Sequence, residues 1–94
     1  MWRIGRVYGR CDMIRVKVKF FSAHREAAGR GQTEIEVKEG TDLKSLLDII
    51  FDTYPEMKKL AGYTVLSLNH RYADGSEVLE EGDEVAVFPP VEGG

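Results

Sequence analysis

Cysteine is almost absent from this 94-residue sequence, in which Cys11 is the only one. A single cysteine excludes an internal disulfide and any zinc site built from several cysteines, and it fits a reducing compartment. Long apolar runs are also missing. No stretch approaches the roughly 18 residues of a membrane-spanning helix, and no apolar run of the kind found in secretory signals follows the basic N-terminal residues. We therefore expect a cytoplasmic protein that neither is exported nor contacts a membrane.

Recognisable sites for metals and nucleotides are missing as well. His24 and His70 lie far apart with no cysteine or carboxylate at ligand spacing, so they are interpreted as surface histidines rather than as a metal site. No glycine-rich phosphate-binding motif occurs. Asp83 and Glu84 stand where a turn becomes a strand, which favours solvated carboxylates over a general acid/base pair. The chain is therefore expected to bind no metal and no cofactor of its own.

The charge balance is mildly acidic, with 13 basic and 16 acidic residues. Three arginines fall within residues 1–12, so the rest of the chain is more acidic than the whole. Its lysines are scattered. This pattern argues against a nucleic-acid partner and predicts that a charged partner presents a basic surface.

The chain is expected to form one small domain with an addition at each end. Residues 1–12 show no hydrophobic period and are interpreted as an upstream start or a flexible arm, with a basic docking arm as the alternative. Residues 13–88 have the composition of a folded domain. Residues 89–94 are expected to form a projecting tail.

Hydrophobic periodicity predicts the elements of that domain. Strict alternation over residues 14–21 and again over 33–37 predicts two half-buried strands, joined by a polar loop with one helical turn at 25–28. Further strands are predicted at residues 63–68, 71–73 and 84–88.

A single long helix is predicted between the second and third strands. Its apolar residues recur at helical spacing and are Leu43, Leu46, Leu47, Ile50, Phe51 and Tyr54. Thr41 is expected to cap its N-terminus, with Asp42 in the first turn, and Pro55 to end it. Residues 56–62 are expected to form an irregular or short helical crossing. The fold class is therefore α+β, a mixed sheet of four to five strands with one main helix packed on one face.

The last seven residues, FPPVEGG, predict a narrow and stiff extension. Pro89 and Pro90 lack backbone donors and favour an extended exit from the sheet. Six extended residues reach roughly 20 Å, at about 3.3 Å each. Gly93 and Gly94 have no side chain that could block a channel, so the tail can deliver its terminal carboxylate into another protein's active site.

Strand parity predicts an apolar cluster at the base of this tail. Phe21 and Phe88 should both point away from the helix, and they should meet if the first and last strands are neighbours. Tyr72 is a third candidate for the same cluster. Exposed aromatics that gather in this way indicate a docking site, although single exposed aromatics are common.

These motifs together resemble a known family. FFSAHREAAG, the helix after Thr41, LSLN and LEEGDEVAVFPPVEGG are similar to the small sulfur-carrier subunits of molybdopterin synthase, the MoaD/ThiS class of ubiquitin-like β-grasp proteins. The resemblance covers residues 13–94, while residues 1–12 have no counterpart in the family. Double glycine ends all such carriers, whereas Phe-Pro-Pro-Val before it is typical of the molybdopterin branch.

The resemblance implies a non-catalytic carrier whose chemistry takes place at Gly94. A partner similar to the ubiquitin-activating enzymes would use MgATP to adenylate Gly94, and a cysteine desulfurase or rhodanese-type protein would supply sulfur. The resulting thiocarboxylate would donate sulfur to a cyclic pyranopterin precursor inside the large synthase subunit. Phe21, Tyr72 and Phe88 would dock that subunit. The tail residues that would thread its channel are Pro89, Pro90, Val91, Glu92 and Gly93.

Two other classes of function stay open at this point. Gly94 of a ubiquitin-like modifier would instead be joined to lysines of target proteins, and both roles begin with adenylation. An interaction domain with an inert tail is the third possibility. Within the carrier class, the Pro-Pro element favours molybdopterin over thiamine supply.

Overall fold

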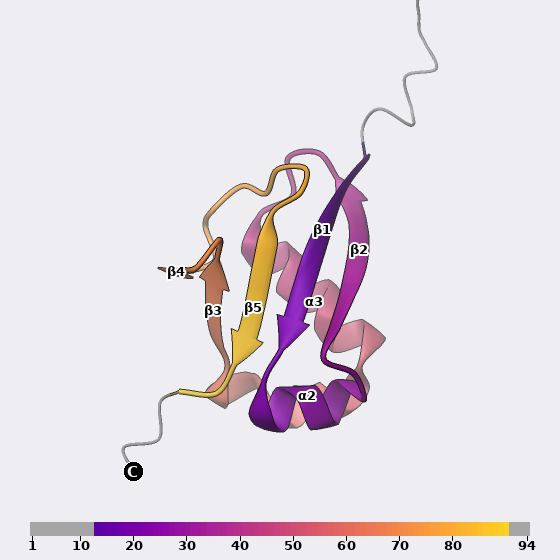
Figure 1. Ribbon diagram of the computed structural model, residues 1–94, viewed down its shortest axis with the longest axis vertical. Coiled ribbons are helices and arrows are strands. Elements are labelled where there is room, and N and C mark those ends of the chain that lie inside the picture. The colour runs from indigo at the N-terminus through magenta and orange to yellow at the C-terminus, as the bar shows by residue number, and fades with distance from the viewer. Residues whose placement is uncertain (1–12, 91–94) are drawn as a thin grey trace, which may run out of the picture.

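The computed structural model describes residues 13–90 and consists of one mixed sheet with an α-helix across one face (Figure 1). The strands are β1 (Met13–Phe20), β2 (Gln32–Lys38), β3 (Val65–Leu68), β4 (Arg71–Ala73) and β5 (Glu84–Phe88). The helices are α2 (Ser22–Ala28), α3 (Leu43–Thr53) and the 3-10 helix η2 (Pro55–Tyr63). The predicted α+β class and its two-layer packing are confirmed.

The strand order is β2-β1-β5-β3-β4, which makes the first and last strands neighbours at the centre of the sheet. β1 and β5 run parallel, with Phe20 opposite Val87, while the other three pairings are antiparallel. Both central strands therefore end on the same side of the domain, where α2 lies and where the chain leaves β5 toward the tail (Figure 1).

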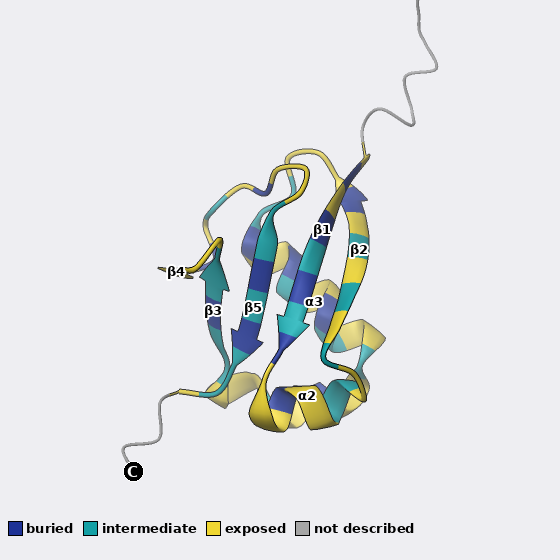
Figure 2. Ribbon diagram, in the orientation of Figure 1, coloured by how far each residue is buried: buried dark blue, intermediate teal, exposed yellow. Residues whose placement is uncertain are grey.

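The hydrophobic core lies between the sheet and α3. The alternating residues of the two central strands are fully or almost fully buried, as Figure 2 shows in dark blue. They pack on the buried residues of α3, Leu43, Leu46 and Ile50. At one end of the core Phe20 meets Tyr54 edge-to-face, with ring centroids 5.5 Å apart. The apolar residues that recur every second position on the strands and every 3.6 positions on the helix thus pack against each other and hold the two layers together.

The helix cap differs from the prediction. Asp42, not Thr41, is the N-cap of α3, because the backbone N–H of Ser45 donates to its Oδ1 at 2.8 Å. Hydrogen bonds from Ser45 lower the pKa of Asp42. Thr41 lies one residue too early to be the cap. Its backbone instead pairs with Leu79, whose N–H donates to the Thr41 carbonyl at 2.9 Å. The helix ends before Pro55 as predicted, and the crossing is the 3-10 helix η2.

The segment between β1 and β2 is more helical than the prediction of a loop with one turn. α2 has seven residues; it begins at Ser22, whose φ of 54° is left-handed, and ends at Ala28, followed by the C-cap Gly29 with a φ of 77°. The Gly29 N–H donates to the carbonyl of Arg25 at 2.9 Å. β3 is shorter than predicted, because η2 continues to Tyr63 and the strand begins only at Val65.

His24 is not a surface residue, so that interpretation was wrong. It lies on the inner side of α2 with no exposed surface, and burial lowers its pKa. His70, in contrast, is an exposed residue in the turn between β3 and β4, with its side chain 81% exposed.

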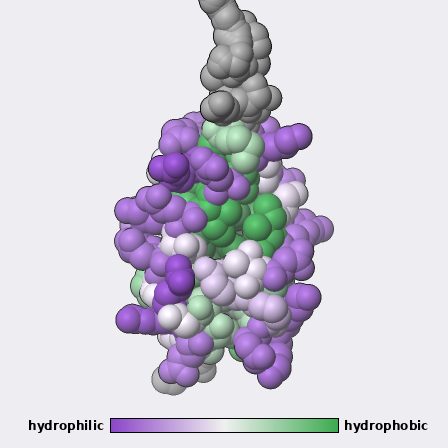
Figure 3. Space-filling view, turned by 90° about the vertical axis from the view of Figure 1, so that its right-hand side faces the viewer, coloured by the Kyte–Doolittle hydropathy of each residue, from purple (hydrophilic) through white to green (hydrophobic). Residues whose placement is uncertain are grey.

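Figure 3 shows the flank where the edge strand β2 meets α3. A compact hydrophobic patch lies there within a hydrophilic surround. Ile35 of β2 and Ile49 of α3 are apolar residues of these elements that remain partly exposed. Among the helices of residues 13–90, none has the length and hydrophobicity needed to cross a bilayer.

Candidate docking face and carrier tail

Much of the sheet's outer face, the face away from α3, is lined by opposite charges. Arg15 of β1 lies 3.9 Å from a carboxylate oxygen of Glu34 and 3.5 Å from one of Glu36, both on β2. Lys19 lies 3.3 Å from Glu84 of β5. These side chains pair across neighbouring strands, so this part of the face satisfies its own charges.

The end of this face nearest the tail is apolar. We define the docking face as Phe21, Tyr72, Ala86, Phe88, Pro89 and Pro90. Phe21 is 47% exposed and Tyr72 75% exposed, which is unusual for large aromatic side chains on one small surface. Tyr72 and Phe88 pack together with ring centroids 6.3 Å apart. The structure therefore brings the three predicted aromatics together.

Two shallow depressions flank Phe88 on this face. The first is lined by Phe21, Ser22, His70, Ala86, Phe88, Pro89 and Pro90. The second is lined by Ser67, His70, Tyr72 and Phe88. Ala86 is small enough to leave the floor of the first depression open. A partner's apolar side chains can therefore insert on either side of the Phe88 ring.

Backbone hydrogen bonds fix the two phenylalanines relative to each other. The N–H of Phe21 donates to the carbonyl of Val87 at 3.1 Å, which extends the parallel pairing by one residue. Phe88 is paired with Val65 on its other side. Because both aromatics belong to the central strands or their direct continuation, the docking face is preorganised.

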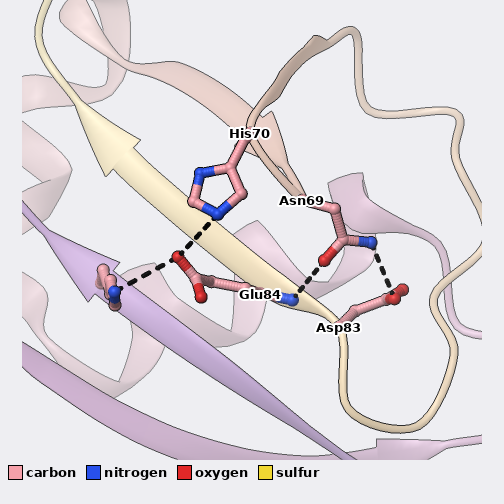
Figure 4. Close-up of polar contacts among 5 residues, drawn as sticks. Asn69, His70, Asp83 and Glu84 are labelled. Atoms are coloured by element: carbon pink, nitrogen blue, oxygen red, sulfur yellow. Dashed lines mark hydrogen bonds and ion pairs between the residues drawn. The ribbon is translucent and has the colours of Figure 1, made fainter.

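His70 lies in a tight turn (Figure 4) and at the border of the docking face, where it lines both depressions beside Phe88. Asn69 and His70 both have left-handed backbones, with φ of 52° and 72°. The Asn69 amide donates to Asp83 Oδ1 at 3.0 Å, and its carbonyl oxygen accepts from the Glu84 N–H at 2.9 Å. His70 Nε2 lies 3.7 Å from the Glu84 carboxylate that also pairs with Lys19.

The predicted tail is only partly within the described residues. Pro89 and Pro90 continue from β5 and line the first depression. Val91, Glu92, Gly93 and Gly94 lie outside the described residues, so their predicted roles in threading and in chemistry stay predictions. The docking roles of Phe21, Tyr72 and Phe88 also stay predictions, although their position is now known.

The described residues of this face form a surface suited to binding. Within residues 13–90, no group of three His, Cys, Asp or Glu side chains is placed to hold a metal ion. Sequence analysis did not identify Ala86 or His70 as part of the site. Parity alone could have indicated Ala86, which lies two residues before Phe88 on the same face, whereas the place of His70 depends on the Asn69 hydrogen bonds.

Comparison with known proteins defines the class of this fold and site. A model of the ThiS family matches residues 18–94. The chain is 40% identical to a Mycobacterium tuberculosis protein named molybdopterin synthase sulfur carrier subunit, over 87% of this chain and 100% of that relative. The chain therefore belongs to the ThiS family.

Solved structures agree on the fold. SAMP1 from Haloferax volcanii, a small archaeal modifier protein, superposes with a TM-score of 0.76 at 26% identity, covering 85% of this chain and 99% of that one. In a complex of subunits 1 and 2 of molybdopterin-converting factor from Helicobacter pylori, one chain matches with a TM-score of 0.65 at 28% identity, covering 86% and 100%. The domain is a ubiquitin-like β-grasp, as the sequence resemblance implied.

Proposed function

We propose that this protein is the sulfur carrier of a molybdopterin synthase and that it presents sulfur on its C-terminal residue, Gly94. The observation that supports this best is the apolar docking face at the point where the chain leaves β5 toward the FPPVEGG tail. The M. tuberculosis relative with the sulfur-carrier name is similar over its whole length. The described side chains supply a surface for binding, and the reactive groups come from partner proteins.

The chemistry at the Gly94 carboxylate begins with a displacement at phosphorus and continues with one at the carbonyl carbon. A carboxylate oxygen attacks the α-phosphorus of MgATP in an adenylating partner, and pyrophosphate leaves. This step turns a poor electrophile into an acyl adenylate. The outer sulfur of a cysteine persulfide on a desulfurase or rhodanese-type donor then attacks the carbonyl carbon, and AMP leaves. A thiol reduces the resulting acyl disulfide and ends in a disulfide with the donor cysteine. The product is a thiocarboxylate.

The thiocarboxylate then serves as the sulfur source for a cyclic pyranopterin. The docking face binds the large synthase subunit and the tail enters its active site, so that the sulfur reaches the substrate without diffusing through solvent. Two such deliveries form the dithiolene that binds the metal. The H. pylori complex of subunits 1 and 2 supports a large-subunit partner for a chain of this fold.

Intact mass spectrometry of the protein from its native cells tests the proposal. The expected result is a species whose mass has increased by the exchange of one oxygen for sulfur, localised to Gly94. A matched control is a variant with one alanine added after Gly94, which should leave the docking face unchanged but should not be adenylated. A native protein that never contains the extra sulfur would contradict the carrier function.

A second function is favoured by the similarity to SAMP1, a protein named as a modifier. In that case the Gly94 carbonyl forms an isopeptide bond with a lysine of another protein after the same adenylation. The same mass experiment separates the two after digestion with a glutamate-specific protease. Cleavage after Glu92 would leave a Gly-Gly remnant on a modified lysine, and such peptides would indicate a modifier.

A further inference from the structure

His24 is held at the inner side of α2 by a short chain of hydrogen bonds. Its Nε2 lies 2.9 Å from the hydroxyl oxygen of Thr64, and that hydroxyl donates to the carbonyl of Leu60 at 2.7 Å. Thr64 directly follows η2 and precedes Val65 of β3. The histidine therefore connects α2 to the junction between η2 and the sheet.

This arrangement defines the tautomer of the ring. A threonine hydroxyl has a single hydrogen, and the hydrogen of Thr64 is already donated to Leu60, so its oxygen must accept from His24. Nε2 therefore carries the ring hydrogen and Nδ1 carries none. Nδ1 is buried and has no hydrogen-bond partner among the described residues. A proton on Nδ1 would place an unpaired positive charge in the interior.

Backbone hydrogen bonds connect His24 to the docking face. The backbone N–H of His24 donates to the carbonyl of Phe21 at 3.1 Å, and the N–H of Phe21 donates to Val87. On the other side, Thr64 precedes Val65, which pairs with Phe88. His24 thus lies between the backbone contacts that hold Phe21 and those that hold Phe88, although it is not part of the docking face itself.

We propose that His24 is a positioning residue of the docking face and that it couples docking to pH: the neutral ring holds α2 and Phe21 in place, and the charged ring releases them. This inference rests on the proposed function for its docking consequence. It concerns a local opening of α2, which has only seven residues and begins at a left-handed Ser22, rather than unfolding of the core.

Among residues 13–90, no charged group is placed to stabilise the imidazolium. The charged side chains of α2 and of the elements packed against it, β1, β5 and η2, are at least partly exposed, whereas the ring is fully buried. They are Arg15, Lys17, Lys19, Arg25, Glu26, Glu56, Lys58, Lys59 and Glu84. Several of them are paired with each other, as in Lys59–Glu56 at 3.0 Å and Lys19–Glu84 at 3.3 Å. Burial alone lowers the pKa of His24.

The sign of the pH effect follows from this lowered pKa. Above the pKa of a free histidine, about 6.5, the ring is neutral whether α2 is closed or open, so the closed form has its full stability. As the pH falls below about 6.5, the open form takes up a proton that the closed form refuses. The closed form then loses stability, by up to about tenfold in the opening equilibrium per pH unit, until the pKa of the closed form is reached.

The first experiment needs no partner and uses the full chain. Hydrogen exchange is measured at about pH 7.5 and about pH 5.5, on either side of the free histidine pKa of about 6.5, and expressed as protection factors. We expect protection of the His24 and Gly29 amides to fall by up to about tenfold at the lower pH, while that of Lys17 in β1 stays nearly constant. Ring nitrogen shifts should report the Nε2–H tautomer at the higher pH.

Two variants identify the group that titrates. His24→Gln keeps a donor for Thr64 but cannot become charged, so its α2 amides should show no such fall. His70→Gln removes the exposed histidine and should retain the wild-type fall. If His24→Gln does not fold, the double variant His24→Leu with Thr64→Val removes both polar partners together and serves the same purpose. Equal falls in wild type and in the uncharged variant would overturn the proposal.

The second experiment measures binding of the large synthase subunit at the same two pH values. The wild-type affinity should fall by up to about tenfold more than that of His24→Gln. Identical pH dependence in the two proteins would overturn the coupling to docking. If neither protein binds the large subunit at either pH, the proposed function fails, while the exchange data still decide whether His24 positions α2.

Discussion

The two faces of the sheet use the same strands for different purposes. On the inner face, Val16 and Val18 of β1 and Val85 of β5 have no exposed surface and pack against α3. On the outer face, the neighbouring residues form ion pairs over most of the area and an apolar cluster at one end. Alternation along a strand therefore separates folding from recognition residue by residue.

This division teaches where each kind of substitution should act. Removing an inner side chain leaves a cavity that α3 cannot fill, so the effect should appear in stability. Removing an outer aromatic exposes no core and should appear in partner binding. Removing an outer charge leaves its partner in water and should have little effect on either.

The largest expected effect is on stability, from Leu46→Ala on the inner side of α3. Leu46 has no exposed surface, so we expect a loss of about 2–5 kcal/mol in the free energy of unfolding. Ile49→Ala on the same helix is the matched control, because Ile49 is 38% exposed and should lose much less. Urea denaturation measures both. Similar losses in the two variants would mean that the Leu46 side of α3 does not face the core.

The next effect is on binding, from Phe88→Ala at the centre of the docking face. Loss of this ring removes the wall between the two depressions, and we expect large-subunit affinity to weaken by about 1–3 kcal/mol, the range for an aromatic hot spot. Isothermal titration calorimetry at neutral pH measures the change. Wild-type affinity in a folded variant would place the docking face elsewhere.

A smaller effect is expected at the border between the two regions, from Asn69→Ala. The variant loses the side-chain hydrogen bonds to Asp83 and Glu84 and must hold alanine at a left-handed φ, so stability should fall by about 1–2 kcal/mol. Asn69→Gly removes the same bonds without the backbone strain and should lose less. Thermal unfolding compares them, and equal losses would assign the whole effect to the side chain.

The smallest effect is expected from Arg15→Ala at the charged part of the outer face. Its carboxylate partners lie at 3.5 and 3.9 Å and all three side chains are more than half exposed, so stability should change by less than about 1 kcal/mol. Affinity for the large subunit should not change. Isothermal titration calorimetry of this variant, run in parallel with Phe88→Ala, checks this. A tenfold loss of affinity would mean that the docking face extends over the charged region.

Sequence patterns were sufficient to predict most of the fold, because burial of one face of a strand requires an alternation of apolar and polar residues that is visible in the sequence. The inner residues of β1 and β5 and the single long helix were predicted, and the adjacency of the first and last strands was the condition on which Phe21 and Phe88 were expected to meet. The outward direction of Phe21 and Phe88 followed from the same parity. These features depend on local period and on a simple rule for layers.

The features that were missed depend on contacts between distant residues. α2 has the polar sequence SAHREAA, and nothing in its period shows that His24 would be buried against Thr64, forty positions away. Asp42 replaced Thr41 as the cap because the backbone of Thr41 pairs with Leu79. His70 lies at the border of the docking face because the hydrogen bonds of Asn69 fix the turn between β3 and β4. Each outcome was decided by tertiary hydrogen bonds that no local pattern contains.

The strand that leads to the tail is hydrogen-bonded to a neighbouring strand on both sides. β5 is paired with β1 in parallel and with β3 antiparallel, and the chain leaves it lengthwise at Phe88. A pull on the tail, such as withdrawal from a tight channel would exert, loads both ladders in shear, so that several hydrogen bonds must break together. The pairing of β5 on both sides can thus resist mechanical force along the tail.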